Sequence, residues 1–208
     1  MELDTLVRTR RTLHGVAELV LAGPQYRTAG TIKLRVIDRG FATKVEPDLR
    51  VEAAELIGGE RRIPLSGKSF AELAESVGVK ASDLSDVYKS GPGLTPADQA
   101  NADPDTAAWI CQCFSIGDKA LRLLAEEQQP ILWPEHFDVG VTIAEVNYGV
   151  SPGDDFEPEP YAYVGPWNTR SGPFWNAPFG AFRRMRELQS ADAVLAFFAT
   201  GRDLAQAH

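Results

Sequence analysis

A histidine and an aspartate two positions apart are the residues of this chain whose types and spacing most readily suggest chemistry. They are His136 and Asp138, and they lie in residues 131–140, ILWPEHFDVG. If residues 135–139 are extended, successive side chains alternate between faces, so His136 and Asp138 share one face. At about 7 Å between Cβ atoms, from the rise of a strand, the two side chains can couple as an acid–base pair or ligate one metal ion.

Three roles for His136 remain open. Its imidazole can anchor the proline-containing turn through a carboxylate or a carbonyl, act as a general acid–base, or ligate a metal. A metal ion needs at least a third ligand, and the candidates are acidic residues further along the chain: Glu145, Asp154, Asp155, Glu157 and Glu159. Four of them lie in residues 151–160, SPGDDFEPEP, whose spacing is not that of an EF-hand loop. A run of charges usually faces water, so this segment predicts a solvated acidic turn.

The region around His136 is unusually rich in aromatic residues and prolines. Residues 133–182 hold 11 of the 19 aromatic residues, and residues 130–178 hold 8 of the 14 prolines. Large apolar side chains on irregular backbone are typical of ligand pockets, although aromatic residues are also ordinary core material. We predict a pocket for a small polar or aromatic molecule, bounded by Trp133, His136, Tyr161, Tyr163, Trp167 and Trp175.

If the protein is an enzyme, this region also predicts the roles of individual residues. His136 is the candidate base, and Asp138 or Glu159 is the candidate orienting partner. No lysine follows Lys119, so Arg170 is the candidate donor to an anionic group of a ligand. An alternative from another class is a protein–protein interface, because Trp, Tyr and Arg also dominate binding hot spots. The sequence leaves the identity of any cofactor unknown.

Several common catalytic signatures do not occur in the sequence. There is no GxSxG, Walker, GxGxxG or HExxH motif. Cys111 and Cys113, on an expected helix, point about 200° apart and cannot both meet one substrate. His14 and Glu18 are one helical turn apart, and we interpret them as a surface pair.

Composition limits the partners and the compartment. The 208 residues carry a net charge of −8, which argues against nucleic acid or an anionic membrane as the main partner. No run of about 18 apolar residues occurs, and the two cysteines form no disulfide framework, so we expect a cytoplasmic protein. Arg10-Arg11 before an apolar run imitates a twin-arginine export signal. His14 and Glu18 interrupt that run, which instead has the spacing of an amphipathic helix ending at Gly23-Pro24.

The elements expected in the first half are mostly hairpins. Alternating patterns predict strand pairs at residues 31–37 with 41–45 and at residues 49–57 with 61–65, and Pro64 places the last strand at an edge. Ser69 and Glu72 form a capping box that opens a short helix. Residues 89–104 predict a loop rich in Gly and Pro.

In the second half, Asp103-Pro104 starts the firmest helix, which extends to about residue 127. Strands are expected at residues 137–146 and 161–164, and helical patterning from residue 181 to the end. The pattern predicts an α+β fold with antiparallel strands in two hairpin-rich halves, packed with N-terminal, central and C-terminal helices. We expect one compact domain, which can consist of two subdomains, 1–88 and 105–208, joined by the loop 89–104.

Four segments resemble a family of uncharacterised bacterial proteins. They are LWPEHFDVG, NYGVSPGDD, EPYAYVGPW and GPFWNAPFGAF, in this order within residues 131–182. The family carries a WPEHFD segment followed by SPGD and EPY-YVGPW segments. The resemblance implies that residues 131–182 are the part of the chain to search for a function, and it assigns no reaction.

Overall fold

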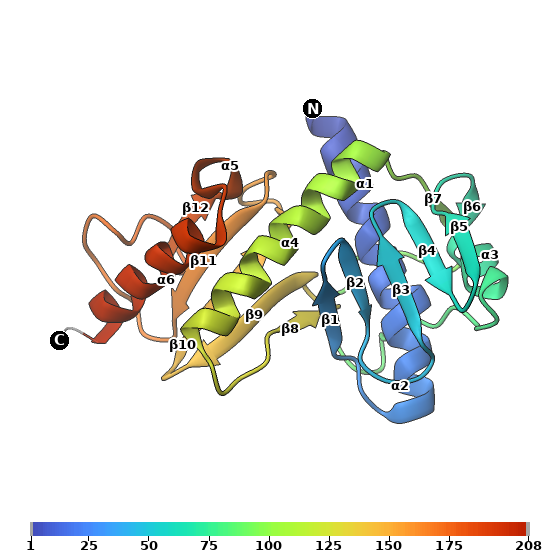
Figure 1. The fold of residues 1–208 in the computed structure, drawn as a ribbon, viewed down its shortest axis with the longest axis horizontal. Coiled ribbons are helices and arrows are strands. Elements are labelled where there is room, and N and C mark those ends of the chain that lie inside the picture. Colours follow the sequence, from blue (N-terminus) through green and yellow to red (C-terminus); the bar gives the residue numbers. More distant parts are fainter. Residues whose placement is uncertain (1, 207–208) are drawn as a thin grey trace. The chain divides into compact units, whose positions relative to one another are not determined.

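The structure is a computed structural model that describes residues 2–206, and it has the α+β fold expected from the sequence, with antiparallel strands (Figure 1). The chain forms two compact units. Unit 1 contains residues 1–112 and 132–137, and unit 2 contains residues 113–131 and 138–208. The boundary falls inside the long helix α4 (Pro104–Leu124), and the segment 89–104 belongs to unit 1.

Unit 1 begins with one helical run of three parts: α1 (Leu3–Gly15), the π-helix η1 (Val16–Ala22) and α2 (Gly23–Ala29). The helix does not end at Gly23-Pro24, so that expectation was wrong. A proline in a helix removes one N–H and crowds the carbonyl of the preceding turn, and such conflicts commonly produce π-bulges or kinks. Here the N–H of Gly23 donates to the carbonyl of Glu18, five residues back, so the run widens before Pro24 and continues.

The strands of unit 1 follow the expected hairpins closely, and each neighbouring pair is antiparallel. Their order is β8-β1-β2-β3-β4-β5. Their bounds are β1 (Leu34–Ile37), β2 (Gly40–Thr43), β3 (Leu49–Glu52), β4 (Glu55–Gly58), β5 (Arg61–Pro64) and β8 (Ile131–Trp133). The expected strand 49–57 is two strands, because Ala53 adopts a φ of 50° and the chain turns there. Pro64 ends the edge strand β5, as predicted.

Local capping signals in unit 1 are confirmed. The capping box of Ser69 and Glu72 starts α3 (Phe70–Ser76), next to the short pair β6 (Lys68–Ser69) and β7 (Gln99–Ala100). At the start of α4, the carboxylate of Asp103 accepts a hydrogen bond from the N–H of Thr106 at 2.9 Å. Each of these contacts satisfies a backbone donor that the first helical turn leaves without a partner.

Unit 2 contains four antiparallel strands in the order β12-β11-β10-β9. Their bounds are β9 (Asp138–Ile143), β10 (Val146–Ser151), β11 (Tyr161–Pro166) and β12 (Ala181–Arg184). The expected strand 137–146 ends earlier, because Ala144 and Glu145 both adopt positive φ and form a tight turn into β10. The C-terminal segment starts with β12 rather than a helix, and then continues as α5 (Met185–Leu188) and α6 (Ala191–Gln206).

Two glycines let helices pack closely on the strands of unit 2. A Cβ on Gly117 of α4 would lie 2.5 Å from a methyl group of Val150, and one on Gly201 of α6 would lie 2.8 Å from a methyl group of Val164. Figure 1 shows α6 lying along β10 and β11, with which it is in contact. None of the helices within residues 2–206 is both long and apolar enough to cross a membrane.

Candidate functional site

The segment that holds His136 is a turn rather than an extended strand. Residues 134–137 form this turn, Phe137 has a φ of 53°, and β9 begins only at Asp138. The alternation that was expected to place His136 and Asp138 on one face is therefore wrong for this stretch. The side chain of His136 is 63% exposed, and its Nε2 lies 3.9 Å from the carboxylate of Glu135.

The anchoring role considered for His136 is filled by His14 of α1. Nε2 of His14 lies 2.7 Å from the carbonyl oxygen of Pro134, and its ring stacks on Phe137 with centroids 5.3 Å apart. A carbonyl only accepts hydrogen bonds, so Nε2 carries the proton. Burial lowers the pKa of His14 to about 4, which keeps the imidazole neutral near pH 7. The interpretation of His14 as a surface residue was wrong.

Asp138 pairs with one of the predicted tyrosines. The hydroxyl of Tyr163 donates a hydrogen bond to the Asp138 carboxylate, and a Cβ added to Gly140 or Gly149 would lie 3.2 or 2.5 Å from this hydroxyl. The hydroxyl of Tyr161, 6.3 Å away between ring centroids, donates to Asp154 at 2.5 Å. Burial raises the pKa of both tyrosines, so they stay protonated donors. Both hydroxyls are thus committed to carboxylates inside unit 2.

The acidic segment 151–160 is partly buried, unlike the solvated turn that was expected. Glu157 is 5% exposed and accepts a hydrogen bond from Nε of Arg184 at 2.9 Å, while Glu159 forms an ion pair with Arg186. Within residues 2–206, no group of three or more His, Cys, Asp or Glu side chains is arranged to hold a metal ion.

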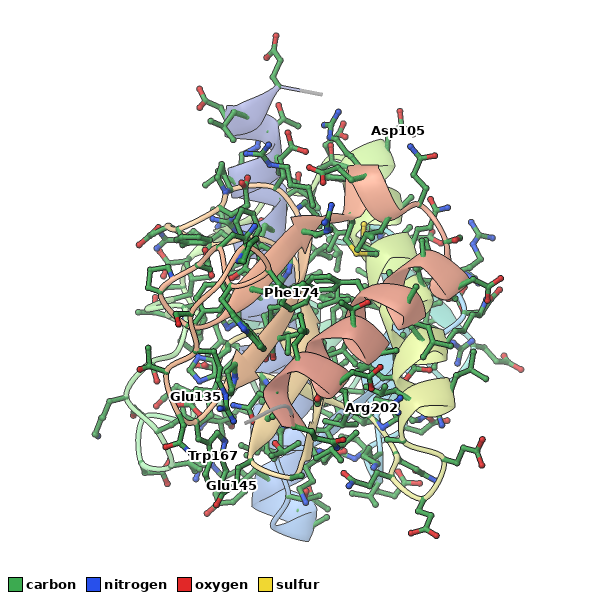
Figure 2. All side chains as sticks on the ribbon, turned by 90° about the vertical axis from the view of Figure 1, so that its left-hand side faces the viewer. Asp105, Glu135, Glu145, Trp167, Phe174 and Arg202 are labelled. Atoms are coloured by element: carbon green, nitrogen blue, oxygen red, sulfur yellow. The ribbon has the colours of Figure 1, made fainter. Side chains whose placement is uncertain are left out.

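The three predicted tryptophans have different surroundings. Trp133 belongs to unit 1, where the Lys33 ammonium lies 5.8 Å from its ring centre. Trp175 packs edge-on against Phe174, with ring centroids 5.0 Å apart. Trp167 is 65% exposed, and its backbone N–H donates to the backbone carbonyl of Glu145 at 2.9 Å, which agrees with the closeness of these two residues in Figure 2.

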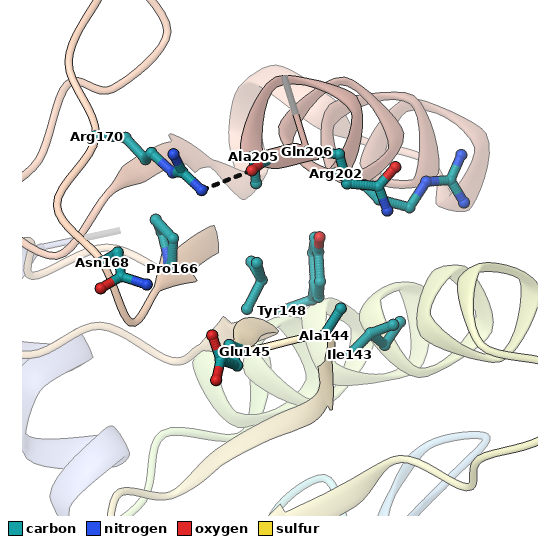
Figure 3. A pocket seen from close by; sticks show the side chains of 11 residues that line it. Ile143, Ala144, Glu145, Tyr148, Pro166, Asn168, Arg170, Arg202, Ala205 and Gln206 are labelled. Carbon is teal, nitrogen blue, oxygen red and sulfur yellow. Dashed lines mark hydrogen bonds between the residues drawn. The ribbon is translucent and has the colours of Figure 1, made fainter. Parts of the chain in front are cut away.

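Arg170 is the predicted residue that the structure places at a cavity. The cavity lies in unit 2 and has a volume of about 50 Å³. It is lined by the β9–β10 turn, the end of β11 and the last turn of α6 (Figure 3). Its polar lining side chains are Glu145, Tyr148, Asn168, Arg170, Arg202 and Gln206.

The guanidinium of Arg170 forms a hydrogen bond through one nitrogen, whereas another nitrogen has no hydrogen-bond partner among the described residues. Its Nη2 donates to the carbonyl oxygen of Ala205 at 2.7 Å, in the last turn of α6, whereas its buried Nε has no hydrogen-bond partner among the described residues. Figure 3 shows Arg170 reaching toward α6, with Tyr148 and Glu145 across the cavity. Arg170 thus brings to the cavity a guanidinium whose Nε–H lacks a hydrogen-bond acceptor among the described residues.

Two further polar groups at the cavity are available to a ligand. The hydroxyl of Tyr148 and the side-chain amide of Asn168 line the cavity, and neither takes part in a side-chain hydrogen bond within residues 2–206. Burial raises the pKa of Tyr148 to about 12, so its hydroxyl is a donor at neutral pH. Tyr148 was not predicted, because this residue lies outside the expected strands 137–146 and 161–164.

A second group of buried polar residues, in unit 1, was also missed. Glu18 lies in the π-helix, is 5% exposed, and accepts a hydrogen bond from the hydroxyl of Tyr88 at 2.9 Å. Burial raises the pKa of Glu18. The interpretation of His14 and Glu18 as a surface pair was wrong. Glu18 is buried and bonded to Tyr88, and the imidazole of His14 is bonded to Pro134 and stacked on Phe137.

Comparison of the chain with family models, with curated proteins and with solved structures finds no significant match. The chemistry of the cavity beside Arg170 and of the Glu18–Tyr88 pair is therefore inferred from the geometry of these residues alone.

Proposed function

We propose that the protein binds a small anionic molecule in the cavity beside Arg170. The observation that carries this proposal is the buried Nε of Arg170, which has no partner among the described residues. Leaving such a donor unpaired costs about 1 to 3 kcal/mol, and a carboxylate or phosphate oxygen would remove that penalty. A guanidinium also favours anions of this planar or tetrahedral geometry through charge-assisted hydrogen bonds.

The charge and size of the lining support the same class of ligand. Among the lining residues, Arg170 and Arg202 carry positive charges and Glu145 carries a negative charge, and Arg202 also forms an ion pair with Asp203 at 3.4 Å. A volume of about 50 Å³ fits a carboxylate-sized group, so a larger ligand must extend its remaining atoms out of the cavity.

The alternatives have less support from the geometry. An acid–base role for His136 lacks the aspartate partner expected from an extended strand, because residues 134–137 form a turn. A protein–protein interface would use exposed rings such as Trp167, Phe156 and Phe179. Single exposed apolar side chains are normal on protein surfaces, so they give weaker support than an unpaired buried donor.

A titration followed by NMR tests the proposal. Acetate and inorganic phosphate are added to the protein, with acetamide and methylammonium chloride as neutral and cationic controls. We expect saturable shifts at Tyr148 and Arg170 with one or both anions only. Replacement Arg170→Met removes a charge-assisted donor, so the affinity should fall about tenfold or more.

Two variants make the result specific. Arg183→Met removes an exposed arginine of β12 and should leave the affinity unchanged. Arg170→Lys keeps the charge but loses the Nε–H, and should bind almost as weakly as Arg170→Met. Equal affinity of the wild-type protein and Arg170→Met, with the fold intact by circular dichroism, contradicts the proposal.

A further inference from the structure

Residues 82–94 of unit 1, which we name the strap, cross the π-helix at close range. The N–H of Ser82 donates to the carbonyl of Leu19 at 2.9 Å. A Cβ on Gly23 would lie 1.9 Å from the carbonyl oxygen of Ser82, and one on Gly15 would lie 2.7 Å from the side chain of Leu94. Residues 79–98 contain no helix or strand, so the strap is held by such contacts rather than by its own secondary structure.

The sequence of the helix explains why the strap can bind there. In the π-helical register the carbonyl of Leu19 would accept a hydrogen bond from residue 24, which is a proline and has no N–H. The carbonyl is left available, and Ser82 of the strap supplies the missing donor. Pro24 thus both shapes the helix and creates the attachment point.

The strap covers a buried carboxyl group. Tyr88 of the strap donates its hydroxyl to Oε2 of Glu18 at 2.9 Å, and a Cβ on Gly91 would lie only 2.4 Å from the same oxygen. Glu18 is 5% exposed under this cover. Since a buried carboxylate loses most of its hydration, the packed strap favours the protonated form.

The charged groups near Glu18 act in the same direction. Desolvation raises the pKa of Glu18 most, and the negative charge of Asp83 on the strap raises it further, whereas the hydrogen bonds from the Tyr88 hydroxyl and the Leu84 backbone, both on the strap, lower it. Glu135 adds negative charge near Tyr88. On the helix, the lowered pKa of His14 keeps that imidazole neutral, so it supplies no positive charge to the carboxylate near pH 7.

We propose that the strap is a proton-linked cover: it packs over Glu18 while the carboxyl group carries a proton, and it opens more easily once the carboxyl group is ionised. Opening returns the carboxylate to water and exposes an acidic group on the π-helix. The coupling is reciprocal, because whatever holds the strap closed also favours protonation of Glu18.

Hydrogen exchange measured by mass spectrometry tests the coupling on the full chain. Protection of strap peptides, corrected for the intrinsic exchange rate, is followed from pH 4.5 to pH 9. The closed form binds the proton more tightly than the open form, whose carboxyl group has its ordinary pKa of about 4.5. Protection should therefore fall by up to tenfold per pH unit above pH 4.5, and become constant above the raised pKa of Glu18.

Variants separate this coupling from a general effect of pH. Glu18→Gln keeps an acceptor for Tyr88 and should make strap protection independent of pH, whereas Glu75→Gln, at an exposed position of α3, should behave as the wild type. Tyr88→Phe removes a contact that lowers the Glu18 pKa, so its profile should shift to higher pH. A flat wild-type profile, the same slope in Glu18→Gln, or an unshifted profile in Tyr88→Phe overturns the proposal.

Discussion

Two sites, one in each unit of this protein, differ in how their buried polar groups are satisfied. In unit 1, Glu18 accepts a hydrogen bond from Tyr88, and His14 donates one to the carbonyl of Pro134. In unit 2, the buried Nε of Arg170 has no hydrogen-bond partner within residues 2–206. Native proteins leave few buried groups unpaired, so the second arrangement is the one that favours binding of an external molecule.

Glu18 and Arg170 also show that a buried group can be satisfied in its hydrogen bonds but not in its charge, or the reverse. Glu18 has a hydrogen-bond donor, yet its surroundings still disfavour its charged form. Arg170 is charged and partly bonded, yet it lacks an acceptor at Nε. Unit 1 is therefore expected to respond mainly to packing and pH, and the cavity of unit 2 mainly to added anions.

The largest expected effect is in the packing of the strap against the helix. Gly23→Ala places a Cβ 1.9 Å from the carbonyl oxygen of Ser82, a backbone atom that cannot simply rotate away. We expect the free energy of unfolding, measured with urea, to fall by about 3 kcal/mol or more. Gly30→Ala is the control. Gly30 has a φ of 70° with open space around it, so its loss should be about 1 to 2 kcal/mol.

Equal losses in the two glycine variants would contradict the close contact of strap and helix. They would also remove the basis for treating the strap as a cover.

The features that were predictable from the sequence are those formed by neighbours along the chain. The capping box of Ser69 and Glu72, the cap at Asp103 and the first hairpin all occur as expected. In each case the interacting groups lie within a few residues of one another, so residue type and spacing determine the contact.

The failures concern contacts between distant segments and backbone that departs from regular geometry. The imidazole that anchors the turn at Pro134 comes from His14, 120 residues away, and no local pattern identifies it. The helix continues through a π-helical stretch before Pro24 where a helix end was expected, and Glu18, which lies in that stretch, is buried. For the site in unit 2, the choice of Arg170 rested on the scarcity of basic residues nearby, and its cavity depends on α6, which is distant in sequence.

The second largest effect is the acid sensitivity of unit 1. Burial lowers the pKa of His14 from 6.5 to about 4, so the unfolded chain binds a proton that the folded chain resists. Stability from this residue is present above pH 6.5 and is lost as the pH falls toward 4. Between pH 6.5 and pH 4.5 the loss should be about 2 to 3 kcal/mol.

Urea unfolding at the two pH values measures this loss against variants. His14→Gln keeps a donor for the carbonyl of Pro134 but cannot be protonated. Between pH 6.5 and pH 4.5, the unfolding free energy of this variant should therefore fall by about 2 to 3 kcal/mol less than that of the wild type. His136→Gln, at a side chain that is 63% exposed, should keep the wild-type dependence. If His136→Gln reduces the pH dependence and His14→Gln does not, the acid sensitivity arises from His136 in the turn 134–137. That result would contradict the burial of His14.

Removing the donor to Glu18 should have an effect of similar or smaller size. Tyr88→Phe leaves the buried carboxyl group without its hydroxyl partner, which typically costs about 1 to 3 kcal/mol. Thermal or urea unfolding at pH 7 measures the change. A loss below about 0.5 kcal/mol would mean that water replaces the tyrosine hydroxyl, and that Glu18 is more accessible than its 5% exposure indicates.

The smallest effect on folding is expected for the matching change in the cavity. Tyr148→Phe removes a hydroxyl that has no hydrogen-bond partner among the described residues, so the free energy of unfolding should change by less than about 0.5 kcal/mol. The same change removes a donor from the proposed anion site, and the affinity for acetate or phosphate should fall about two- to tenfold. If Tyr148→Phe instead destabilises the protein as much as Tyr88→Phe and leaves anion affinity unchanged, the two tyrosines have the same structural role. The contrast between a satisfied group in unit 1 and an available one in unit 2 would then be wrong.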